Sequence, residues 1–361
     1  MAMTPRENLL HLWRREGYEY APVNFSWCPS QQEEFNRRMG KPTDPGEYFK
    51  MPMHWVPGPS PKKSKGEIDW RKIYPFEVKP DAGFDSYGVA HEKGSEAAKH
   101  MTHMRHPLEP FESVEQLAAW PMDDFSSAGH EHIIPHVKAL HDRGLAAMGG
   151  MACTIWEVSW YLRGMEQLMM DMMNDDPCAT WLLDKMTESA ISRAQAYTRA
   201  GCDCLQFGDD VGTQSTLLMS PEMYREWIKP RFRKVIAAVR EVSKDIIITY
   251  HSCGYVTPLI DDLIDVGVQV LNPVQPECMD FAEIHERFGN RLSFWGSIGT
   301  QTTMPFGTPA DVRREVLRNL GIAGPKGGLF CSPTHLIEPE VPWENIMAYV
   351  DACREFTTAG A

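Results

Sequence analysis

Two residues with metal-binding side chains, His251 and Cys253, directly follow the most strand-like stretch of the chain, Ile246 to Tyr250. A β-branched run of this kind is typical of a buried strand. Because side chains alternate along a strand, His251 and Cys253 face the same side, with Cα atoms roughly 6–7 Å apart. An imidazole and a thiol presented together at a strand end are the usual first half of a zinc site. The alternative interpretation is a core thiol beside a hydrogen-bonded histidine.

A catalytic zinc site needs at least a third protein ligand and keeps one coordination position open. Three later residues could supply this ligand: Cys278, Cys331 and His335. On the last predicted strand, Cys331 lies four residues before His335 and therefore roughly 13 Å deeper. We therefore expect His251, Cys253 and His335 to bind the metal, with replacement of His335 by Cys278 or Cys331 left open. The loop from Asn272 to Cys278 could add a further ligand: Gln275 or Glu277.

Other polar and aromatic residues lie at the ends of further predicted strands. They are Asn24, Trp27, Asp209, Asp210, Asn272 and Trp295. Asp209 and Asp210 are adjacent, so on a strand they face opposite ways. We expect one of them to face the substrate and the other to cap a loop or helix, and parity alone does not assign which. For a single residue a local hydrogen bond is the simpler interpretation, whereas the set as a whole favours a shared site.

The elements that would position these residues alternate regularly between strand and helix from residue 145 onward. The predicted strands are 145–152, 202–208, 246–254, 268–274, 292–298 and 327–335. Such alternation implies parallel strands with right-handed crossovers. With a first strand at 20–27, and 84–90 as a second strand or an edge hairpin, eight strands are reachable. We therefore predict an α/β fold of the (β/α)₈ TIM-barrel type, whose active sites lie at the C-terminal strand ends. A doubly wound open sheet is the alternative.

The predicted barrel carries an N-terminal helical and irregular extension. Residues 28–80 are rich in proline and aromatic residues without a sustained period, so we expect short helices and loops that cover one end of the body. We predict residues 1–80 as the extension and 81–361 as the barrel, with the strand at 20–27 belonging to the barrel. No G-x-G-x-x-G or G-x-x-x-x-G-K-[ST] sequence occurs at a strand–helix turn, which removes the simplest nucleotide-binding interpretations.

Composition restricts the location and the partners of the protein. The 361 residues are 43% hydrophobic and 24% charged, with a formal net charge of −13. Because Lys and Arg do not cluster, nucleic acid and anionic membrane surfaces are poor partners. No apolar run reaches the roughly 18 residues of a membrane span, and no signal sequence is recognisable at the N-terminus. Nine cysteines without a spaced framework indicate free thiols in a reducing compartment, so we expect a cytoplasmic protein.

Several segments of the chain resemble the uroporphyrinogen decarboxylase superfamily. They are Gly208-Asp-Asp-Val-Gly-Thr-Gln, Met219-Ser-Pro-Glu-Met-Tyr-Arg-Glu-Trp-Ile-Lys-Pro, Tyr250-His-Ser-Cys-Gly, Leu271-Asn-Pro-Val-Gln-Pro-Glu-Cys, Phe294-Trp-Gly-Ser-Ile-Gly and Glu338-Pro-Glu-Val-Pro-Trp-Glu-Asn. The resemblance is strong from about residue 145 onward and thin before residue 80. It implies a TIM barrel that is either a cofactor-free decarboxylase or a zinc methyltransferase serving a corrinoid protein.

Two features favour the methyltransferase branch. In the decarboxylases, an arginine-rich segment after the first strand clamps a substrate with many carboxylates. In this chain, the first arginine after the predicted strand at 20–27 is Arg37. The His251-x-Cys253 pair falls where the zinc methyltransferases place theirs. Their third ligand is usually a cysteine, and His335 stands at that place. The glutamate ligand of the distantly related methionine synthases would fall near Gln275. Both positions depart from the family pattern.

The resemblance implies that zinc, as a Lewis acid, activates a small methylated substrate whose methyl group a cobalt(I) corrinoid accepts. The chain has no D-x-H-x-x-G corrinoid-binding sequence, so the corrinoid would arrive on a partner protein. Aromatic residues of the N-terminal region suit an aryl methyl ether: Trp13, Trp27 and Trp55. Asp85, Asp209 and Asp210 could orient substrate groups or handle a proton. The alternatives are a metal-free decarboxylase or lyase, and a non-enzymatic corrinoid-protein or ligand-binding subunit. A homodimer is one possible assembly.

Overall fold

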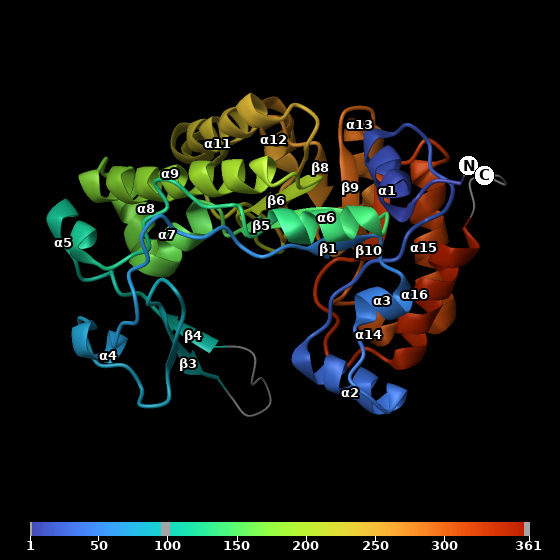
Figure 1. Ribbon diagram of the computed structural model, residues 1–361, viewed down its shortest axis with the longest axis horizontal. Coiled ribbons are helices and arrows are strands. Elements are labelled where there is room, and N and C mark those ends of the chain that lie inside the picture. The colour runs from blue at the N-terminus through green and yellow to red at the C-terminus, as the bar shows by residue number, and fades with distance from the viewer. Residues whose placement is uncertain (1, 95–101, 357–361) are drawn as a thin grey trace.

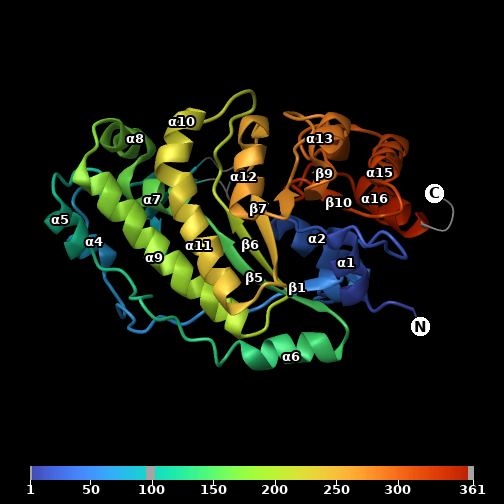
Figure 2. The ribbon, with the colours of Figure 1, turned by 90° about the horizontal axis from the view of Figure 1, so that it is seen from above.

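The centre of the protein is a parallel sheet whose strands follow one another in sequence order. The computed structural model describes residues 2–94 and 102–356. The sheet order is β1-β5-β6-β7-β8-β9-β10, and each neighbouring pair is parallel. The strands are β1 (Met53–Trp55), β5 (Ala146–Ala152), β6 (Cys204–Gly208), β7 (Ile247–His251), β8 (Val270–Asn272), β9 (Ser293–Ile298) and β10 (Leu329–Pro333). A doubly wound sheet reverses its strand order at a switch point. This order does not reverse, so the open-sheet alternative is wrong, and the curved seven-stranded sheet is TIM-barrel-like (Figure 2).

Helices follow the strands and form the outer layer (Figure 2). In the N-terminal half they are α1 (Pro5–Arg14), α2 (Pro29–Met39), α3 (Pro45–Phe49), α4 (Trp70–Ile73), α5 (Val114–Ala119), α6 (Ile134–Asp142), α7 (Trp156–Arg163), α8 (Met165–Met173) and α9 (Pro177–Arg199). In the C-terminal half they are α10 (Pro221–Met223), α11 (Lys229–Val242), α12 (Ile260–Val266), α13 (Phe281–Phe288), α14 (Thr303–Phe306), α15 (Pro309–Ala323) and α16 (Trp343–Glu355), with a π-helical turn at Tyr224–Ile228 and a 3₁₀ turn at Thr257–Leu259.

Local sequence explains where the long helices begin and end. Asp176 accepts the backbone N–H of Cys178, and Pro177 occupies the first turn of α9. A serine, threonine or aspartate followed by proline is a typical helix start, because the side chain satisfies a free N–H and proline has none to satisfy. Residues 156–173 form two helices and not one, because Gly164 adopts a φ of +83° between α7 and α8. This turn sets the direction of α7, which contacts the candidate site.

The six predicted strands from residue 145 onward are all confirmed, each one to four residues shorter than predicted. Their side chains are almost all buried on both faces, as expected for a parallel sheet that lies between helices and a filled interior. Ile247, Ile248 and Tyr250 are each at most 1% exposed. The β-branched pattern therefore identified these strands correctly.

The predicted first strand at 20–27 is wrong as an element of the sheet ladder. Its backbone is extended, but it makes only isolated contacts, such as the parallel bridge between Trp27 and Ile337. The Tyr349 hydroxyl donates to the Asn24 carbonyl at 2.9 Å and accepts the Asn24 N–H at 3.1 Å. A side chain thus takes up two backbone groups that a strand partner would use. The strand that pairs with β5 is β1. It is only three residues long and lies within residues 28–80, which were predicted as short helices and loops.

Residues 84–90, predicted as a second strand or an edge hairpin, belong to a separate antiparallel sheet. It consists of β2 (Gly83–Phe84), β3 (Ala90–Lys93) and β4 (Thr102–Arg105). In Figure 1 this sheet lies with α4 at the lower left, while α2 and α3 lie at the lower right. The hairpin alternative is therefore confirmed, and 84–90 adds no strand to the parallel sheet. Within the described ranges, no helix combines the length and apolarity that a membrane crossing requires.

Candidate metal centre and substrate cavity

The carboxyl ends of β6, β7 and β8 lie at one level and bring the candidate side chains together. Gly208 is the register partner of His251, and His251 is the partner of Asn272. A Cβ atom on Gly208 would lie 2.6 Å from the His251 carbonyl oxygen, so glycine is required for this close approach. Asp210 follows β6 by two residues and Cys253 follows β7 by two residues. Strand pairing therefore places four functional side chains at one edge of the sheet.

Asp210, His251 and Cys253 present ligand atoms that all lie within 4.8 Å of one another. His251 Nε2 is 3.4 Å from Cys253 Sγ and 3.8 Å from Asp210 Oδ1. Two ligand atoms bound to zinc at about 2.0–2.3 Å in a tetrahedral arrangement lie roughly 3.3–3.8 Å apart. Both separations measured from His251 Nε2 therefore match those expected around a zinc-sized ion. We refer to Asp210, His251 and Cys253 as the ligand triplet.

The side chain of Asn272 orients His251 within the triplet. Asn272 Nδ2 donates to the Trp295 carbonyl at 2.7 Å, which identifies the other amide atom as the oxygen. This Oδ1 lies 2.5 Å from His251 Nδ1. Because an amide oxygen only accepts hydrogen bonds, Nδ1 carries the proton and Nε2 has a free lone pair. A histidine that donates its second N–H to an oxygen acceptor is the usual arrangement around a bound metal.

The electrostatics of the triplet are unfavourable without a cation. Burial, followed by the Asp210 carboxylate, raises the pKa of the Cys253 thiol to about 12. The side chain of Glu157, on α7, is also buried, and burial followed by Asp210 raises its pKa. A bound dication stabilises the ionised form of such groups. The site thus concentrates acidic groups that a metal ion would stabilise.

His335, expected as the third ligand, lies near the triplet but outside it. Burial, followed by the nearby His251, lowers the pKa of His335. In the described part of the chain, the close-spaced group contains Asp210 and does not include His335. Cys278 and Cys331 are also outside this close-spaced group: Cys278 Sγ contacts Gln214 Oε1 at 3.4 Å, and Cys331 is only 1% exposed.

Asp209, the neighbour of Asp210, caps a helix instead of facing the triplet. Its carboxylate accepts the backbone N–H groups of Ile155 at 3.1 Å and Glu157 at 2.9 Å, at the start of α7. It is 1% exposed. Burial and then the Glu157 carboxylate raise the pKa of Asp209 to about 8, while the N–H groups act in the opposite sense. The division expected for this pair therefore has Asp209 as the cap and Asp210 beside the metal-binding side chains.

Gln275 and Glu277, expected as additional ligands, form hydrogen bonds with the surrounding loops. Gln275 Oε1 accepts the N–H of Gly254 at 3.1 Å and so holds the turn that follows Cys253. Glu277 Oε1 accepts the N–H of Gln301 at 3.1 Å and the Thr302 hydroxyl at 2.9 Å. Both residues bind the loops around the site.

A cavity of about 270 Å³ opens beside His251 and His335. Three of the predicted substrate-binding residues line it: Asn24, Asn272 and Trp295. Further lining residues include Phe25, Met53, Trp55, Gln206 and Leu336. No lysine or arginine is among the described residues that form its wall. The cavity is thus aromatic and neutral apart from its histidines, and it suits a small uncharged molecule better than a polyanion.

Trp27 and Asp85, also predicted to bind substrate, do not line this cavity. Trp27 packs against Phe25 and Phe35 and donates from Nε1 to Gln32 at 2.8 Å. Asp85 accepts the backbone N–H groups of Tyr87 and Val89 in the turn between β2 and β3. Their polar atoms are used locally.

Two residues near the triplet were missed by the sequence analysis. Glu157 lies in the first turn of α7, and no motif in the sequence distinguished it from other helical carboxylates. Gln206 lines the cavity, and its Nε2 lies 3.4 Å from Asn272 Oδ1. It is a polar residue within an otherwise apolar strand, Cys204-Leu-Gln-Phe-Gly208, and this pattern could have identified it.

Comparisons with known proteins identify a family and several relatives of this chain. A family model described as uroporphyrinogen decarboxylase (URO-D) matches residues 97–356. A methylcobamide:CoM methyltransferase, MtaA, of Methanosarcina barkeri is 32% identical over 48% of this chain and 48% of its own length. A methylated-thiol–coenzyme M methyltransferase of Methanosarcina mazei is 26% identical over 55% of this chain and 50% of its own. A uroporphyrinogen decarboxylase of Pseudomonas syringae is 28% identical over 52% of this chain and 51% of its own.

The matched stretch spans about half the length of each of these curated relatives. Among solved structures, a methyltransferase from Methanosarcina mazei superimposes with a TM-score of 0.65 at 20% identity. That superposition covers 98% of this chain and 99% of the other. At this level of identity, the structural similarity establishes a shared fold.

Proposed function

Because this chain belongs to the uroporphyrinogen decarboxylase (URO-D) family, in agreement with the resemblance noted from its sequence, we propose that it is a corrinoid-linked methyltransferase. The reaction moves a methyl group between a small methylated substrate and a corrinoid protein. The names of two relatives, a methylcobamide:CoM methyltransferase and a methylated-thiol–coenzyme M methyltransferase, support this class of reaction.

The ligand triplet is the single observation on which the proposal depends. Zinc would be held by Asp210, His251 and Cys253, with His335 as a further candidate at the edge of the same cavity. When bound, zinc supplies a Lewis acid that makes the heteroatom bearing the methyl group a better leaving group. The protein contributes the lone pair of His251 Nε2, whose direction Asn272 sets. Gln275 holds the turn after Cys253, and Asp209 holds the helix that carries Glu157.

The neutral and aromatic cavity supports an aryl methyl ether as the substrate. Trp55 and Trp295 offer flat apolar surfaces, and Asn24 and Gln206 offer amide groups for a ring substituent. The cavity opens beside the ligand triplet, so a substrate held there would place its methyl-bearing oxygen toward Asp210, His251 and Cys253. The proposed direction is therefore demethylation of a small aromatic ether.

The corrinoid would be carried by a partner protein. The chain contains no D-x-H-x-x-G sequence, so it offers no recognisable corrinoid-binding segment of its own. Docking would have to occur where the methyl group is accessible, at the carboxyl ends of the strands. All nine cysteines are free thiols, which supports a reducing compartment such as the cytoplasm. The homodimer stays a prediction.

For the fold, we propose that the sheet closes into a barrel and that residues 26–28 form part of the closure. Ile337 donates its N–H to the Ser26 carbonyl at 2.9 Å and accepts the N–H of Cys28 at 3.1 Å. Asn24 and Phe25 line the same cavity as Met53 of β1 and Ser332 of β10. These contacts support residues 20–28 as the eighth strand position, between β10 and β1. Because β1 itself lies at Met53–Trp55, the barrel would draw two strand positions from residues 1–80 and the others from residues 81–361.

A metal-free decarboxylase is the second candidate, because uroporphyrinogen decarboxylases are also among the relatives. The wall of the cavity contains no arginine or lysine to bind substrate carboxylates. To distinguish the two functions, purified protein loaded with zinc is incubated with cob(I)alamin and a panel of aryl methyl ethers. Formation of methylcobalamin, followed by its absorption spectrum, and its loss in Cys253→Ala support the transferase. Carbon dioxide release from an aromatic or tetrapyrrole carboxylate, unaffected by Cys253→Ala and a chelator, would replace it with the decarboxylase.

A further inference from the structure

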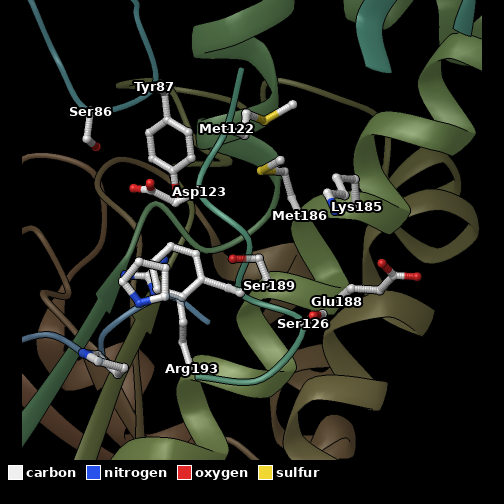
Figure 3. A pocket seen from close by; sticks show the side chains of 13 residues that line it. Ser86, Tyr87, Met122, Asp123, Ser126, Lys185, Met186, Glu188, Ser189 and Arg193 are labelled. Atoms are coloured by element: carbon white, nitrogen blue, oxygen red, sulfur yellow. The ribbon is translucent and has the colours of Figure 1, made fainter. Parts of the chain in front are cut away.

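A second cavity lies on the outer side of the sheet, against α9, and shares no lining residue with the substrate cavity. Its volume is about 340 Å³, within the range of about 300–1,000 Å³ that small-molecule sites occupy. Figure 3 shows side chains from four segments that converge on it. These segments are residues 59–61 after β1, residues 86–87 of the β2–β3 turn, residues 122–126, and α9 from residue 185 to residue 193.

The walls of this cavity are held in place by backbone hydrogen bonds. Ser60 and Gly129 exchange N–H to carbonyl bonds of 3.1 and 2.9 Å, which joins the first segment to the loop that precedes α6. The N–H of Ala128 donates to the Ser192 hydroxyl at 2.7 Å and so ties that loop to α9. A cavity with fixed walls binds a ligand at a smaller entropic cost than a mobile surface does.

Two cationic side chains of α9 face this cavity without an ionic partner. Within residues 2–94 and 102–356, neither Lys185 nor Arg193 makes a hydrogen bond or an ion pair. The Arg193 guanidinium lies 5.4 Å from the centre of the Phe125 ring, which fixes its position but leaves its N–H donors free. Lys185 acts electrostatically on Asp124, which lies outside the wall.

The two acidic residues of the wall do not neutralise these cations. Asp123 is already bound to Lys65, with 2.8 Å to the backbone N–H and 3.0 Å to Nζ. Glu188 is exposed and makes no hydrogen bond or ion pair with another described residue. The wall therefore carries two cations and two carboxylates, and neither cation forms an ion pair with either carboxylate. Its hydroxyl groups come from Ser86, Ser126 and Ser189.

We propose that this cavity binds a small carboxylic acid with an aromatic or other apolar body. Lys185 and Arg193 supply charged donors for the carboxylate, and the serine hydroxyls add neutral donors. Met122, Met186 and Phe125 supply the apolar surface against which the body packs. Pro59, Pro61 and the ring of Tyr87 add further apolar surface. This apolar surface favours an organic acid over inorganic phosphate, which would use the charges alone.

The test is isothermal titration calorimetry of the full chain with benzoate, benzamide and inorganic phosphate. We expect saturable benzoate binding, with benzamide and phosphate each weaker by about tenfold or more, because loss of a charged hydrogen bond and loss of apolar contact each cost this much. Lys185→Met and Arg193→Met should each weaken benzoate binding about tenfold. Lys185→Arg should retain it.

Matched variants locate the site. Lys244→Met removes the same charge from an exposed position far along the chain and should leave benzoate binding unchanged. His335→Ala alters the substrate cavity and should also leave it unchanged. Circular dichroism checks that each variant is folded. Absence of saturable benzoate binding, equal affinity for benzamide or phosphate, or wild-type benzoate affinity in both Lys185→Met and Arg193→Met would overturn the proposal.

Discussion

Asn272 Oδ1 and His251 Nδ1 lie 2.5 Å apart at the ends of two neighbouring strands. The two residues are register partners, so the hydrogen bond is a direct product of strand pairing. It determines which nitrogen of His251 is free, and this nitrogen faces Cys253 and Asp210. The geometry of the ligand triplet thus depends on a residue that is not a member of it.

Replacement of Asn272 by alanine should weaken zinc binding by about 10- to 100-fold, because the preferred tautomer and ring orientation of His251 are lost. Zinc affinity is measured by competition with a chromophoric chelator. Asn345→Ala is the control, because Asn345 is also buried and donates to two carbonyls, Met304 and Gly307, each at 2.8 Å. Equal losses of affinity in both variants would indicate general destabilisation and not control of His251.

Substitutions of the adjacent residues Asp209 and Asp210 should have different effects, one on stability and the other on metal binding. Asp209→Ala removes the cap of α7 and should lower the free energy of unfolding of the metal-free protein by about 1–2 kcal/mol. Asp210→Ala should change that free energy little and reduce zinc affinity. Urea denaturation and chelator competition measure the two quantities. The reverse pattern, a stable Asp209→Ala protein with poor zinc binding, would contradict the assignment of the cap.

Trp55 should contribute to substrate binding without supporting the fold. It lines the substrate cavity and is 54% exposed, so Trp55→Ala should leave the melting temperature nearly unchanged. Loss of aromatic contact should raise KM for an aryl methyl ether about 3- to 10-fold with a smaller change in kcat. Tyr48→Ala removes an aromatic side chain of similar exposure, 47%, that is not in the cavity wall. If both variants raise KM equally, Trp55 has no specific role.

Glu315 should make stability fall as pH rises. Burial raises the pKa of Glu315 in the folded protein above its ordinary value. Between the unfolded value of about 4.3 and the folded value, the folded state holds more protons than the unfolded state, so the free energy of unfolding decreases with increasing pH. Glu315→Gln should flatten this part of the profile, and the exposed Glu241→Gln should not. Urea denaturation from pH 4 to pH 7 measures both, and an unchanged slope in Glu315→Gln would refute the assignment.

The sequence was sufficient for most of the sheet and for two members of the ligand triplet. The β-branched run before His251 predicted both its strand and the shared direction of His251 and Cys253, because alternation holds within a strand. The direction of the Asp210 side chain could not be assigned, because the alternation of side chains ends where β6 ends. Beyond that point the direction of the loop depends on tertiary contacts, such as the 2.8 Å hydrogen bond from the Cys253 N–H to Asp210. The strand β1 is three residues long and lies shortly after Pro52, so it shows no period to detect.

The segment at 20–27 shows the opposite error. Its sequence favours a strand, yet Tyr349, more than 300 residues away in the chain, binds both backbone groups of Asn24. Such long-range competition has no local signal in the sequence. The same limit applies to His335, which lines the substrate cavity but lies outside the ligand triplet.

The most direct test of the account is the zinc content of the purified protein after exhaustive dialysis, measured by inductively coupled plasma mass spectrometry. The account predicts one tightly bound zinc ion per chain, lost in His251→Ala and in Cys253→Ala while both variants keep the wild-type circular dichroism spectrum. Wild-type protein without zinc above background even after incubation with added zinc, or undiminished zinc in both variants, would contradict it.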